Sequence, residues 1–289
     1  MTKVTLFNGM DWSINKRFKM ELDILLSDVK YDEMDVVIPI TGHEGVGKSF
    51  FARGLAMYCA TFLGTKFSVS DIEFDVYQYK MNSLEKPVFS VNLLDEARKV
   101  LGKGKFRDPV VEDFLDYLSE CRKKQQVHLI LLPAYHDLKA YVVKWRCPMI
   151  IELRKNYVTD NSRPSGVRML RGEYRVYTTK KDINYFYEHP YKYPKKYTIR
   201  DRWSSKEVFT PEMKQAYEDK KDEFTIEKYG KKQEEKIAKK AMIATRQKVL
   251  PVLIKEFPNV DQVVLGRIFG CANTTISRDL KTIEAKNEN

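Results

Sequence analysis

Residues 42–49 read GHEGVGKS, a glycine-rich motif that constrains both the fold and the ligand of this chain. The short apolar run before it, DVVIPI at 35–40, is typical of a buried strand. The residues after it, 50–63, contain few helix breakers and predict a helix. A strand, a glycine loop and a helix in this order form the Walker A loop, in which backbone N–H groups surround phosphate oxygens.

The residues of this loop have distinct expected roles. The glycines permit the backbone angles that aim N–H groups at phosphates. We expect Lys48 to reach the β- and γ-phosphates of ATP and the Ser49 hydroxyl to ligate Mg²⁺. The predicted nucleotide-binding residues are Gly42, His43, Glu44, Gly45, Val46, Gly47, Lys48, Ser49 and Phe50. The alternative is a glycine-rich turn that matches the motif by chance.

A second element, PVFSVNLLDEA at 87–97, is apolar enough for a central strand. It ends in Asp95 and Glu96, at the edge of a parallel sheet where ligands bind. We expect Asp95 to hold Mg²⁺ through water and Glu96 to polarise the attacking water, so that Glu96 and Lys48 are the predicted catalytic residues. The alternative is that the acidic pair only begins a helix, where it suits the helix dipole.

Two further strands are predicted at 127–132 (VHLILL) and 149–153 (MIIEL), with an amphipathic helix before them at 110–124. His136 follows the first of these strands and is the candidate for a polar sensor residue, with Tyr135 second. The alternative is that both are ordinary loop residues. Together these elements predict an α/β fold with a mainly parallel sheet.

The order of GHEGVGKS, LLDEA, ECRKK–VHLILLP and WRCPMIIEL resembles the RecA-like P-loop ATPases of the FtsK/HerA and zonula-occludens-toxin-like group, which includes viral DNA-packaging ATPases. The resemblance covers residues 36–153. It implies a RecA-like core, ATP and Mg²⁺ as cofactors, a homo-oligomeric ring, and a viral or mobile-element origin. It also implies an arginine supplied by a neighbouring subunit, for which the candidates are Arg122, Arg146 and Arg154.

The last residues, 251–289, predict a small all-α domain. A short helix is expected at 261–269 with Asp261 as its N-cap, and a second helix at 274–285. This pair resembles a helix-turn-helix, which places its second helix in the major groove of DNA. Its expected apolar core is Val264, Leu265, Ile268, Phe269, Ile276, Leu280 and Ile283. Its candidate DNA contacts are Asn273, Thr274, Thr275, Ser277, Arg278 and Lys281. The alternative is a helical hairpin used for packing or oligomerisation.

The charge of the chain favours a nucleic-acid partner. The chain has 51 basic and 40 acidic residues, which gives a net charge of +11. Between positions 151 and 203, thirteen Lys and Arg stand against six Asp and Glu, with tyrosines interleaved. Basic residues beside aromatic ones can hold a phosphate backbone and stack on bases. The alternative is a solvated hairpin and a loop whose tyrosines pack on the core. Residues 167–179 predict a hairpin that turns at Arg171-Gly172.

The remaining sequence suggests the organisation of the chain. The predicted segments are a helical N-terminus (1–30, with a helix at 16–29), an ATPase domain with a hairpin extension (31–200), a charged arm of two helices separated at Gly230 (201–250) and the helix-turn-helix domain (251–289). Four scattered cysteines without CxxC spacing indicate a reducing compartment and no zinc site. With no signal-peptide pattern and no apolar stretch of about 20 residues, we expect a cytoplasmic protein without membrane contact, in the host cytoplasm if the gene is viral.

These features predict an ATP-hydrolysing, DNA-binding protein that translocates, packages or remodels DNA. Two alternatives remain open. One is a DNA-binding regulator or partitioning factor that uses ATP as a switch, and the other is a small-molecule kinase with a regulatory tail. A DNA motor predicts ATP turnover that responds to DNA, whereas the kinase predicts activity that survives Glu96→Gln.

Overall fold

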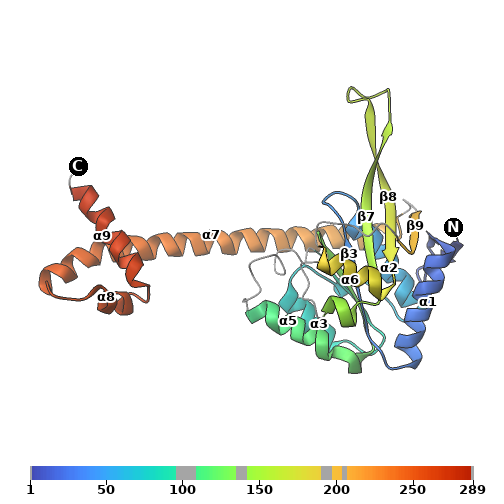
Figure 1. The fold of residues 1–289 in the computed structure, drawn as a ribbon, viewed down its shortest axis with the longest axis horizontal. Helices are drawn as coiled ribbons and strands as arrows, with labels where there is room; N and C mark the ends of the chain where they lie inside the picture. The colour runs from blue at the N-terminus through green and yellow to red at the C-terminus, as the bar shows by residue number, and fades with distance from the viewer. Residues whose placement is uncertain (1, 96–108, 135–141, 190–196, 204–206, 288–289) are drawn as a thin grey trace. The chain divides into compact units, whose positions relative to one another are not determined.

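The computed structural model describes residues 2–95, 109–134, 142–189, 197–203 and 207–287. The chain divides into two compact units, Met1–Asp219 (unit 1) and Lys220–Asn289 (unit 2). Unit 1 is a mixed α/β structure built on a sheet that has seven strands among the described residues and is mainly parallel (Figure 1). The α/β class and the mainly parallel sheet predicted from the sequence are therefore confirmed.

The order of the strands places β3 in the middle of this sheet. In sequence order the strands are β3 (Val36–Thr41), β4 (Ile72–Glu73), β5 (Val91–Leu94), β6 (Val127–Leu132), β7 (Ile150–Thr159), β8 (Val167–Tyr177) and β9 (Ile199–Arg202). In space the order is β4-β5-β6-β3-β7-β8-β9. The first five strands are parallel to one another, and β8 pairs antiparallel with both of its neighbours, β7 and β9. The chain leaves β3 for the far edge, returns to one side of it with β6 and continues on the other side with β7. Open α/β sheets bind ligands at such a switch point, beyond the carboxyl ends of the strands.

Helices cover both faces of the sheet. They are α1 (Lys16–Tyr31), α2 (Lys48–Leu63), α3 (Val76–Glu85), α5 (Pro109–Glu120) and α6 (Lys180–Glu188), with short helical turns η1 (Val69–Asp71), η2 (Cys121–Lys124) and η4 (Val142–Arg146). On one face α1 packs on α2, and the rings of Phe18 and Phe51 stack with centroids 6.5 Å apart. On the other face α3, α5 and α6 share one apolar core, to which they contribute Tyr79, Phe114 and Ile183.

The N-terminal segment is an integral part of unit 1. A two-stranded antiparallel hairpin, β1 (Thr2–Thr5) and β2 (Asp11–Ile14), precedes α1 and was not predicted. The Asn15 side chain caps α1 by accepting hydrogen bonds from the first-turn N–H groups. Trp12 of β2 is buried so closely against α2 that a Cβ at Gly54 would lie 2.8 Å from the indole nitrogen. The segment therefore folds with the sheet rather than beside it.

Strand β5 is shorter than the predicted 87–97. It begins at Val91, because Phe89 has a φ of 65° and the chain is still turning there. It ends at Leu94, so Asp95 directly follows the strand, as expected. Strand β6 has the predicted bounds, and β3 differs from its prediction by one residue at each end.

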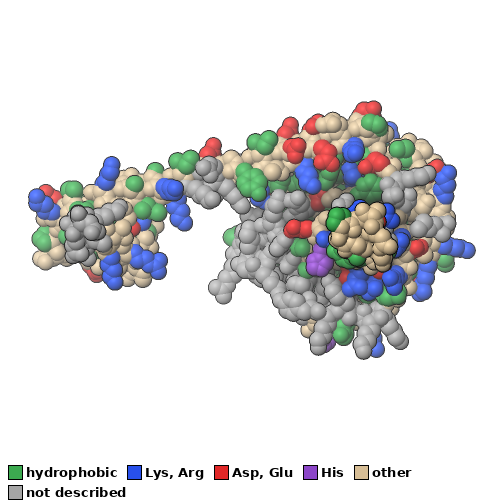
Figure 2. All heavy atoms as spheres, turned by 90° about the horizontal axis from the view of Figure 1, so that it is seen from above, with side chains coloured by type: hydrophobic (Ala, Val, Ile, Leu, Met, Phe, Trp, Pro, Cys, Tyr) green, Lys and Arg blue, Asp and Glu red, His purple; other side chains and the backbone are tan. Residues whose placement is uncertain are grey.

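Strands β7 and β8 form a long antiparallel ribbon. Its turn lies at 160–166, where the Asp160 N–H donates to the Gly166 carbonyl oxygen at 2.9 Å, and not at Arg171-Gly172 as predicted. Gly172 lies inside β8 with a φ of 107°, at a β-bulge where two residues of β8 oppose Lys155. From Lys155 to its end β7 is half-buried or exposed, and the ribbon extends beyond the body of unit 1 (Figure 1). Figure 2 looks along the ribbon and shows Lys and Arg side chains on the surface around it.

Helix α7 (Pro211–Glu256) is one continuous helix, where the sequence predicted two helices separated at Gly230. A glycine inside an exposed helix costs only about 1 kcal/mol relative to alanine, and the Lys, Glu and Gln residues around position 230 favour a helix. Gly230 therefore does not end it. Helix α7 begins in unit 1 and continues into unit 2, where α8 (Gln262–Ile268) and α9 (Asn273–Asn287) follow.

Candidate functional site

The glycine loop, residues 42–47, connects the carboxyl end of β3 to the first turn of α2. Gly42 has a φ of 143°, and a Cβ there would lie 2.4 Å from the carbonyl oxygen of Leu153 in β7. Gly47 has a φ of 97°, and a Cβ there would lie 3.2 Å from the ring of Trp203. Both positions need glycine, because the backbone itself passes against β7 and Trp203. Tertiary packing therefore fixes the path of the loop.

Lys48 closes this loop from the first residue of α2. Its Nζ donates to the carbonyl oxygen of Gly42 at 2.6 Å and to that of His43 at 3.0 Å. The N-cap of α2 is Gly47, which has no side chain to bond the first-turn N–H groups. Such N–H groups, together with the helix dipole and a nearby amine, form a site for an anion.

The other residues of the predicted phosphate site surround this helix start. The side chains of His43 and Glu44 are exposed and that of Val46 is buried, whereas Ser49 and Phe50 are half-buried. The Ser49 hydroxyl thus lies at the base of the loop rather than in bulk solvent. All nine predicted nucleotide-binding residues lie in one contiguous stretch, the loop 42–47 and the first turn of α2.

Asp95 lies at the same edge of the sheet, because β3 and β5 point in the same direction with β6 between them. It is 3% exposed, and its N–H donates to the carbonyl oxygen of Glu73 at 2.8 Å. Its Oδ2 accepts a hydrogen bond of 2.7 Å from the hydroxyl of Tyr217. Glu96, the predicted catalytic residue beside it, lies outside the described residues.

The hydroxyl of Tyr217 is bonded to Asp95, one of the two predicted magnesium ligands. Burial raises the pKa of Tyr217 and the Asp95 carboxylate raises it further, whereas the Ser49 hydroxyl acts in the opposite direction. The Tyr217 hydroxyl therefore stays protonated and donates to Asp95.

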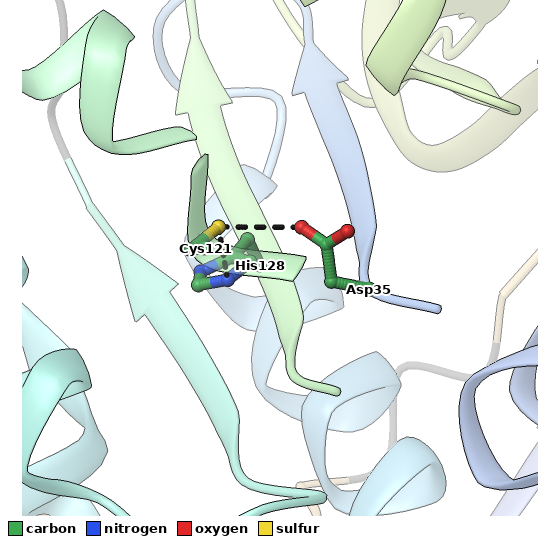
Figure 3. Close-up of side chains that lie close together, drawn as sticks. All are labelled: Asp35, Cys121 and His128. Atoms are coloured by element: carbon green, nitrogen blue, oxygen red, sulfur yellow. Dashed lines mark hydrogen bonds between the residues drawn. The ribbon is translucent and has the colours of Figure 1, made fainter. Parts of the chain in front are cut away.

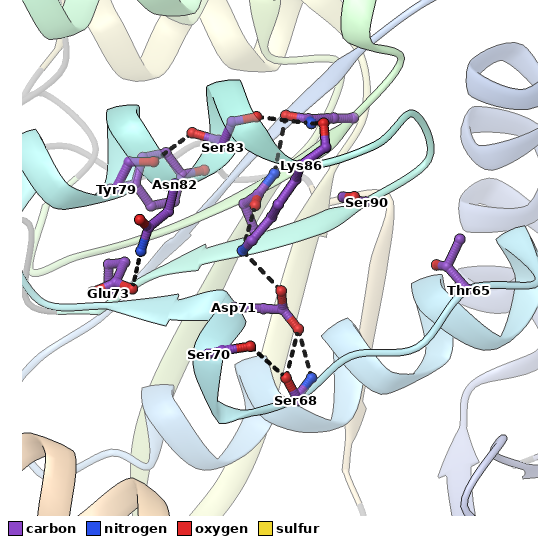
Figure 4. Close-up of polar contacts among 12 residues, drawn as sticks. Thr65, Ser68, Ser70, Asp71, Glu73, Tyr79, Asn82, Ser83, Lys86 and Ser90 are labelled. Carbon is purple, nitrogen blue, oxygen red and sulfur yellow. Dashed lines mark hydrogen bonds and ion pairs between the residues drawn. The ribbon is translucent and has the colours of Figure 1, made fainter.

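A polar network joins η1, α3 and the start of β5 (Figure 4). Lys86, which follows α3, bridges two elements: its Nζ lies 2.8 Å from Oδ1 of Asp71 in η1 and donates to Oδ1 of Asn92 in β5 at 3.0 Å. The network therefore anchors the strand that leads to Asp95. At the other end of that strand, the Glu73 carbonyl oxygen of β4 accepts the N–H of Asp95.

Arg53 of α2 is a residue of this site that sequence reasoning missed. Its guanidinium carbon lies 4.8 Å from the ring centroids of both Phe209 and Tyr217. The residue is 5% exposed, its Nη2 lies 3.5 Å from Oε2 of Glu207, and its Nε and Nη1 have no hydrogen-bond partner within the described part of the chain. One signal was available, since Arg53 is the only charged residue in the otherwise apolar stretch 49–63.

Tyr217 and Trp203 could not have been found from sequence. They lie far beyond the predicted motifs, in segments whose composition suggested only a charged arm and a basic hairpin. Trp203 follows β9 and its N–H donates to the Gly172 carbonyl oxygen, which holds the indole against the glycine loop. Only the tertiary structure connects these residues with Lys48.

The three arginines predicted to act on a neighbouring subunit differ in how the structure describes them. Arg146 is buried and forms an ion pair with Asp35, so its guanidinium is not placed to reach another subunit. Arg154 is partly exposed and pairs with Glu152 at 2.8 Å. The side chain of Arg122 and the whole of the sensor candidate His136 lie outside the described residues, as does Tyr135. Arg154 is the candidate whose described position leaves it accessible.

A second polar cluster lies at the opposite, amino edge of the sheet (Figure 3). The Sγ of Cys121 is 3.2 Å from Oδ2 of Asp35 and 3.5 Å from Nε2 of His128. These three buried ligand atoms are close enough to share a metal ion. Arg146 pairs with the same Asp35 oxygen, and the Tyr79 hydroxyl is 2.8 Å from Nδ1 of His128.

The charges of this cluster balance without a metal. Burial lowers the pKa of His128 to about 4 and raises that of Cys121 to about 12, so both are neutral near pH 7. Asp35 and Arg146 then carry one charge of each sign. A divalent cation would have to displace the Cys121 proton and compete with the buried Arg146 guanidinium for the same Asp35 oxygen. The cluster therefore serves as an internal hydrogen-bond network of the fold.

Unit 2 contains the end of α7 together with α8 and α9. Leu250, Leu265 and Ile276, one from each helix, are buried and form its core. Asp261 is the N-cap of α8, as predicted, and accepts a hydrogen bond from the Val263 N–H at 3.0 Å. Partly buried residues around this core are Leu253, Ile254, Val260, Phe269, Cys271, Leu280 and Ile283.

Two residues assigned to this core from sequence are on the surface. Val264 is 45% exposed and Ile268 is 61% exposed, because the seven-residue helix α8 presents only a narrow stripe to its neighbours. The turn after α8 is tight: the Cys271 N–H donates to the Gly266 carbonyl oxygen at 2.8 Å, and a Cβ at Gly266 would lie 2.7 Å from the Cys271 carbonyl oxygen. A buried ion pair between Arg246 and Asp279 ties α7 to α9.

The predicted DNA contacts lie together on the first three turns of α9. Asn273, Thr274, Arg278 and Lys281 are exposed, whereas Thr275 and Ser277 are half-buried. The Asn273 side chain accepts a hydrogen bond from the Thr274 N–H at 2.8 Å. The exposed residues thus form one polar face opposite Ile276.

Across the described residues, no helix has the length and the apolar character needed to cross a bilayer. No model of a known protein family matches the sequence, and no curated protein sequence matches it.

Proposed function

We propose that this protein is a P-loop ATPase with a RecA-like core, similar to the FtsK/HerA and zonula-occludens-toxin-like group, that hydrolyses ATP to translocate, package or remodel DNA. The observation that carries the proposal is that Lys48 and Ser49, in the first turn of α2, and Asp95, which follows β5, lie at the same carboxyl edge of the parallel sheet. A glycine loop, an amine, a hydroxyl and a carboxylate at the switch point of a parallel sheet are the groups that ATP and Mg²⁺ require.

The residues of the site have separate tasks in this proposal. The loop N–H groups and the dipole of α2 would hold the phosphates, and Lys48 would exchange its bonds to the loop carbonyls for bonds to phosphate oxygens. Ser49 and Asp95 would hold Mg²⁺, and the ion would neutralise charge on the phosphate oxygens. Glu96 would polarise the attacking water.

Two surfaces are proposed to contact DNA. The first is α9, whose exposed polar face carries Arg278 and Lys281, as in a helix-turn-helix. The second is the β7–β8 ribbon, where residues 155–171 contain four basic residues and one acidic residue and Tyr157 is 65% exposed. A two-stranded ribbon has little stability of its own and matches the width of the major groove.

The test of hydrolysis is an ATPase assay of the full chain with and without duplex and single-stranded DNA, alongside a mass measurement with ATP bound. We expect Mg²⁺-dependent turnover that DNA stimulates, and a ring of several subunits. Loss of a general base lowers rates by about 10²–10⁴-fold, so Glu96→Gln should bind ATP and lose turnover by such a factor.

Other outcomes of this assay favour the alternatives. Turnover that ignores DNA would favour a nucleotide-switched regulator or partitioning factor. Transfer of phosphate to a metabolite, with Glu96→Gln almost fully active, would favour a small-molecule kinase. Absence of ATP binding would contradict the whole proposal.

The DNA surfaces are tested by duplex affinity as a function of salt concentration. Each lost phosphate contact should reduce the slope of log affinity against log salt by about 0.9, and a lost base contact should cost about 1–3 kcal/mol. We expect Arg278→Ala to weaken binding and to change its sequence dependence. Lys255→Ala, which removes an exposed charge at the end of α7, is the matched control. Equal behaviour of the two variants would remove α9 from the DNA interface.

A further inference from the structure

Tyr217 reaches the predicted magnesium site from α7, a helix outside the sheet. Its hydroxyl donates to Oδ2 of Asp95 at 2.7 Å across 122 positions of sequence. Tyr217 is 2% exposed and Asp95 is 3% exposed, so water competes little for this bond. One buried phenol therefore holds the carboxylate that is proposed to bind Mg²⁺.

The ring that carries this hydroxyl packs against other side chains on two sides. The ring of Phe74, which follows β4, lies with its centroid 5.8 Å away and tilted by 47°. On another side the guanidinium of Arg53 lies 4.8 Å from the ring centroid, within the range of a cation–π contact. Phe74 and Arg53 belong to the same unit as Asp95. The phenol thus has a defined position rather than a mobile one.

Burial and hydrogen bonds also hold the segment before α7 in place. Val208 and Phe209 are buried, and the Asn8 side chain donates to the Val208 carbonyl oxygen at 2.9 Å. Pro211 occupies the first position of α7, where its missing N–H costs nothing. Thr210 accepts the Met213 N–H on its side chain at 3.3 Å. These contacts set where α7 begins and hence where Tyr217, in its second turn, points.

Groups that hydrogen-bond the ligands of a metal fix ligand orientation, and losing one lowers metal affinity by about 10–100-fold. A carboxylate has two oxygens, so Asp95 can accept from Tyr217 on one and face Mg²⁺ or its water on the other. Tyr217 is neutral, so it orders the carboxylate without cancelling its charge. It fills the role of an orienting group better than a lysine or arginine would.

We propose that Tyr217 is a positioning residue of the magnesium site: its hydroxyl holds the Asp95 carboxylate in the orientation that the Mg²⁺–nucleotide complex requires and joins the start of α7 to that site. This inference rests on the proposed ATP binding. It adds a residue that no motif in the chain indicates.

The test is Tyr217→Phe in the full chain, which keeps the ring against Phe74 and Arg53 and removes only the hydroxyl. Equilibrium binding of a fluorescent ATP analogue is measured in EDTA and across a Mg²⁺ titration. We expect the affinity in EDTA to stay within about twofold of wild type and the Mg²⁺ concentration for half-maximal binding to rise by about 10-fold or more.

Tyr58→Phe is the matched control. Tyr58 is another buried tyrosine whose hydroxyl donates to an aspartate, Asp23, but that pair lies between α1 and α2 rather than at the glycine loop. Its Mg²⁺ titration should match that of wild type. A variant effect common to both tyrosines would reflect general destabilisation and would overturn the role of Tyr217.

The outcomes separate this inference from the proposed function. If wild type binds nucleotide with Mg²⁺ and Tyr217→Phe has an unchanged Mg²⁺ dependence, the positioning role is wrong and ATP binding stands. An equal loss of affinity with and without Mg²⁺ also overturns it, because the hydroxyl would then act on the fold or on the nucleotide. If wild type shows no nucleotide binding, the proposed function fails and Tyr217 has no metal site to order.

Discussion

Charged groups are buried at both edges of the central sheet, but the two edges differ in how completely these groups are paired. At the amino edge, Asp35 and Arg146 form an ion pair inside a cluster whose polar atoms contact one another. At the carboxyl edge, Arg53 keeps two donors without partners among the described residues, and the first turn of α2 has no side-chain cap. Burial of charge alone therefore does not mark a functional site. The informative feature is incomplete pairing beside a helix N-terminus.

The sharpest test of this comparison replaces one buried arginine at each edge. Arg146→Met leaves the Asp35 carboxylate buried without its partner, and we expect the free energy of unfolding to fall by about 3–5 kcal/mol. Arg53→Met removes a guanidinium that is only partly paired, so we expect a much smaller loss. Urea unfolding at pH 7 measures both. The pair Asp35→Asn with Arg146→Met should recover part of the loss, and equal losses at the two edges would break the comparison.

The next largest effect is expected for activity at the carboxyl edge. Lys48→Ala removes the amine that would stabilise phosphate charge, and losing one such group costs about 10²–10³-fold in rate. The fold should tolerate it, because Lys48 is half-buried and its amine donates to carbonyl oxygens of the loop itself. Steady-state ATPase rates and thermal unfolding of the same preparation measure the two properties. Lys66→Ala, a lysine just beyond α2, is the control for charge, and a Lys48→Ala enzyme with wild-type turnover would contradict the site.

The amino edge predicts a pH dependence of stability. Burial lowers the pKa of His128 from 6.5 to about 4, with Asp35, Cys121, Arg146 and Tyr79 around the ring. Between pH 4 and pH 6.5 the unfolded chain binds a proton at His128 that the folded chain does not. The contribution of neutral His128 to the free energy of unfolding is therefore complete above about pH 6.5 and is lost as the pH falls toward 4. The loss cannot exceed about 3 kcal/mol.

Urea titrations between pH 7 and pH 4.5 check this contribution. His128→Gln should show a flatter decline of stability with falling pH than wild type, whereas His189→Gln, which replaces a half-buried histidine at the C-cap of α6, should keep the wild-type slope. If His128→Gln declines as steeply as wild type, other groups account for the acid sensitivity.

The smallest effect is expected from metal added to the amino edge. Because Asp35, Arg146, Cys121 and His128 balance their charges, Zn²⁺ should leave the thermal unfolding of wild type and of Cys121→Ser equally unchanged. ATP with Mg²⁺ should stabilise the protein by about 2.7 kcal/mol when its concentration is 100 times the dissociation constant. Stabilisation by Zn²⁺ that disappears in Cys121→Ser would reverse the assignment of the two edges.

Local signals predicted a large part of unit 1. The glycine loop, the helix after it and the strands β3 and β6 were recognisable because each depends on a short stretch of residues with a clear period or motif. The start of α8 at Asp261 was predictable for the same reason, since an N-cap acts within three residues. These elements place Lys48 and Ser49 in the first turn of α2, whereas packing against distant segments fixes the path of the loop before them.

Predictions failed where distant contacts or competing local preferences decide the outcome. The ribbon turn was expected at Gly172, but pairing of β7 with β8 makes that glycine a bulge and moves the turn to 160–166. Gly230 was expected to divide the arm, but the helix-forming residues on both sides outweigh one glycine. Val264 was expected in the core of unit 2, but the seven-residue helix α8 buries only a narrow stripe and leaves this side chain exposed.

The sequence by itself determined that residues 42–49 can form a phosphate-binding turn and that Asp95 follows an apolar strand, because backbone freedom at glycine and the period of apolar residues are local properties. The tertiary structure alone decided which groups meet at that turn. Leu153 and Trp203 pack against the glycines, and Tyr217 donates a hydrogen bond to Asp95. No spacing rule connects these residues, because strand order and helix packing bring them together across more than a hundred positions of chain.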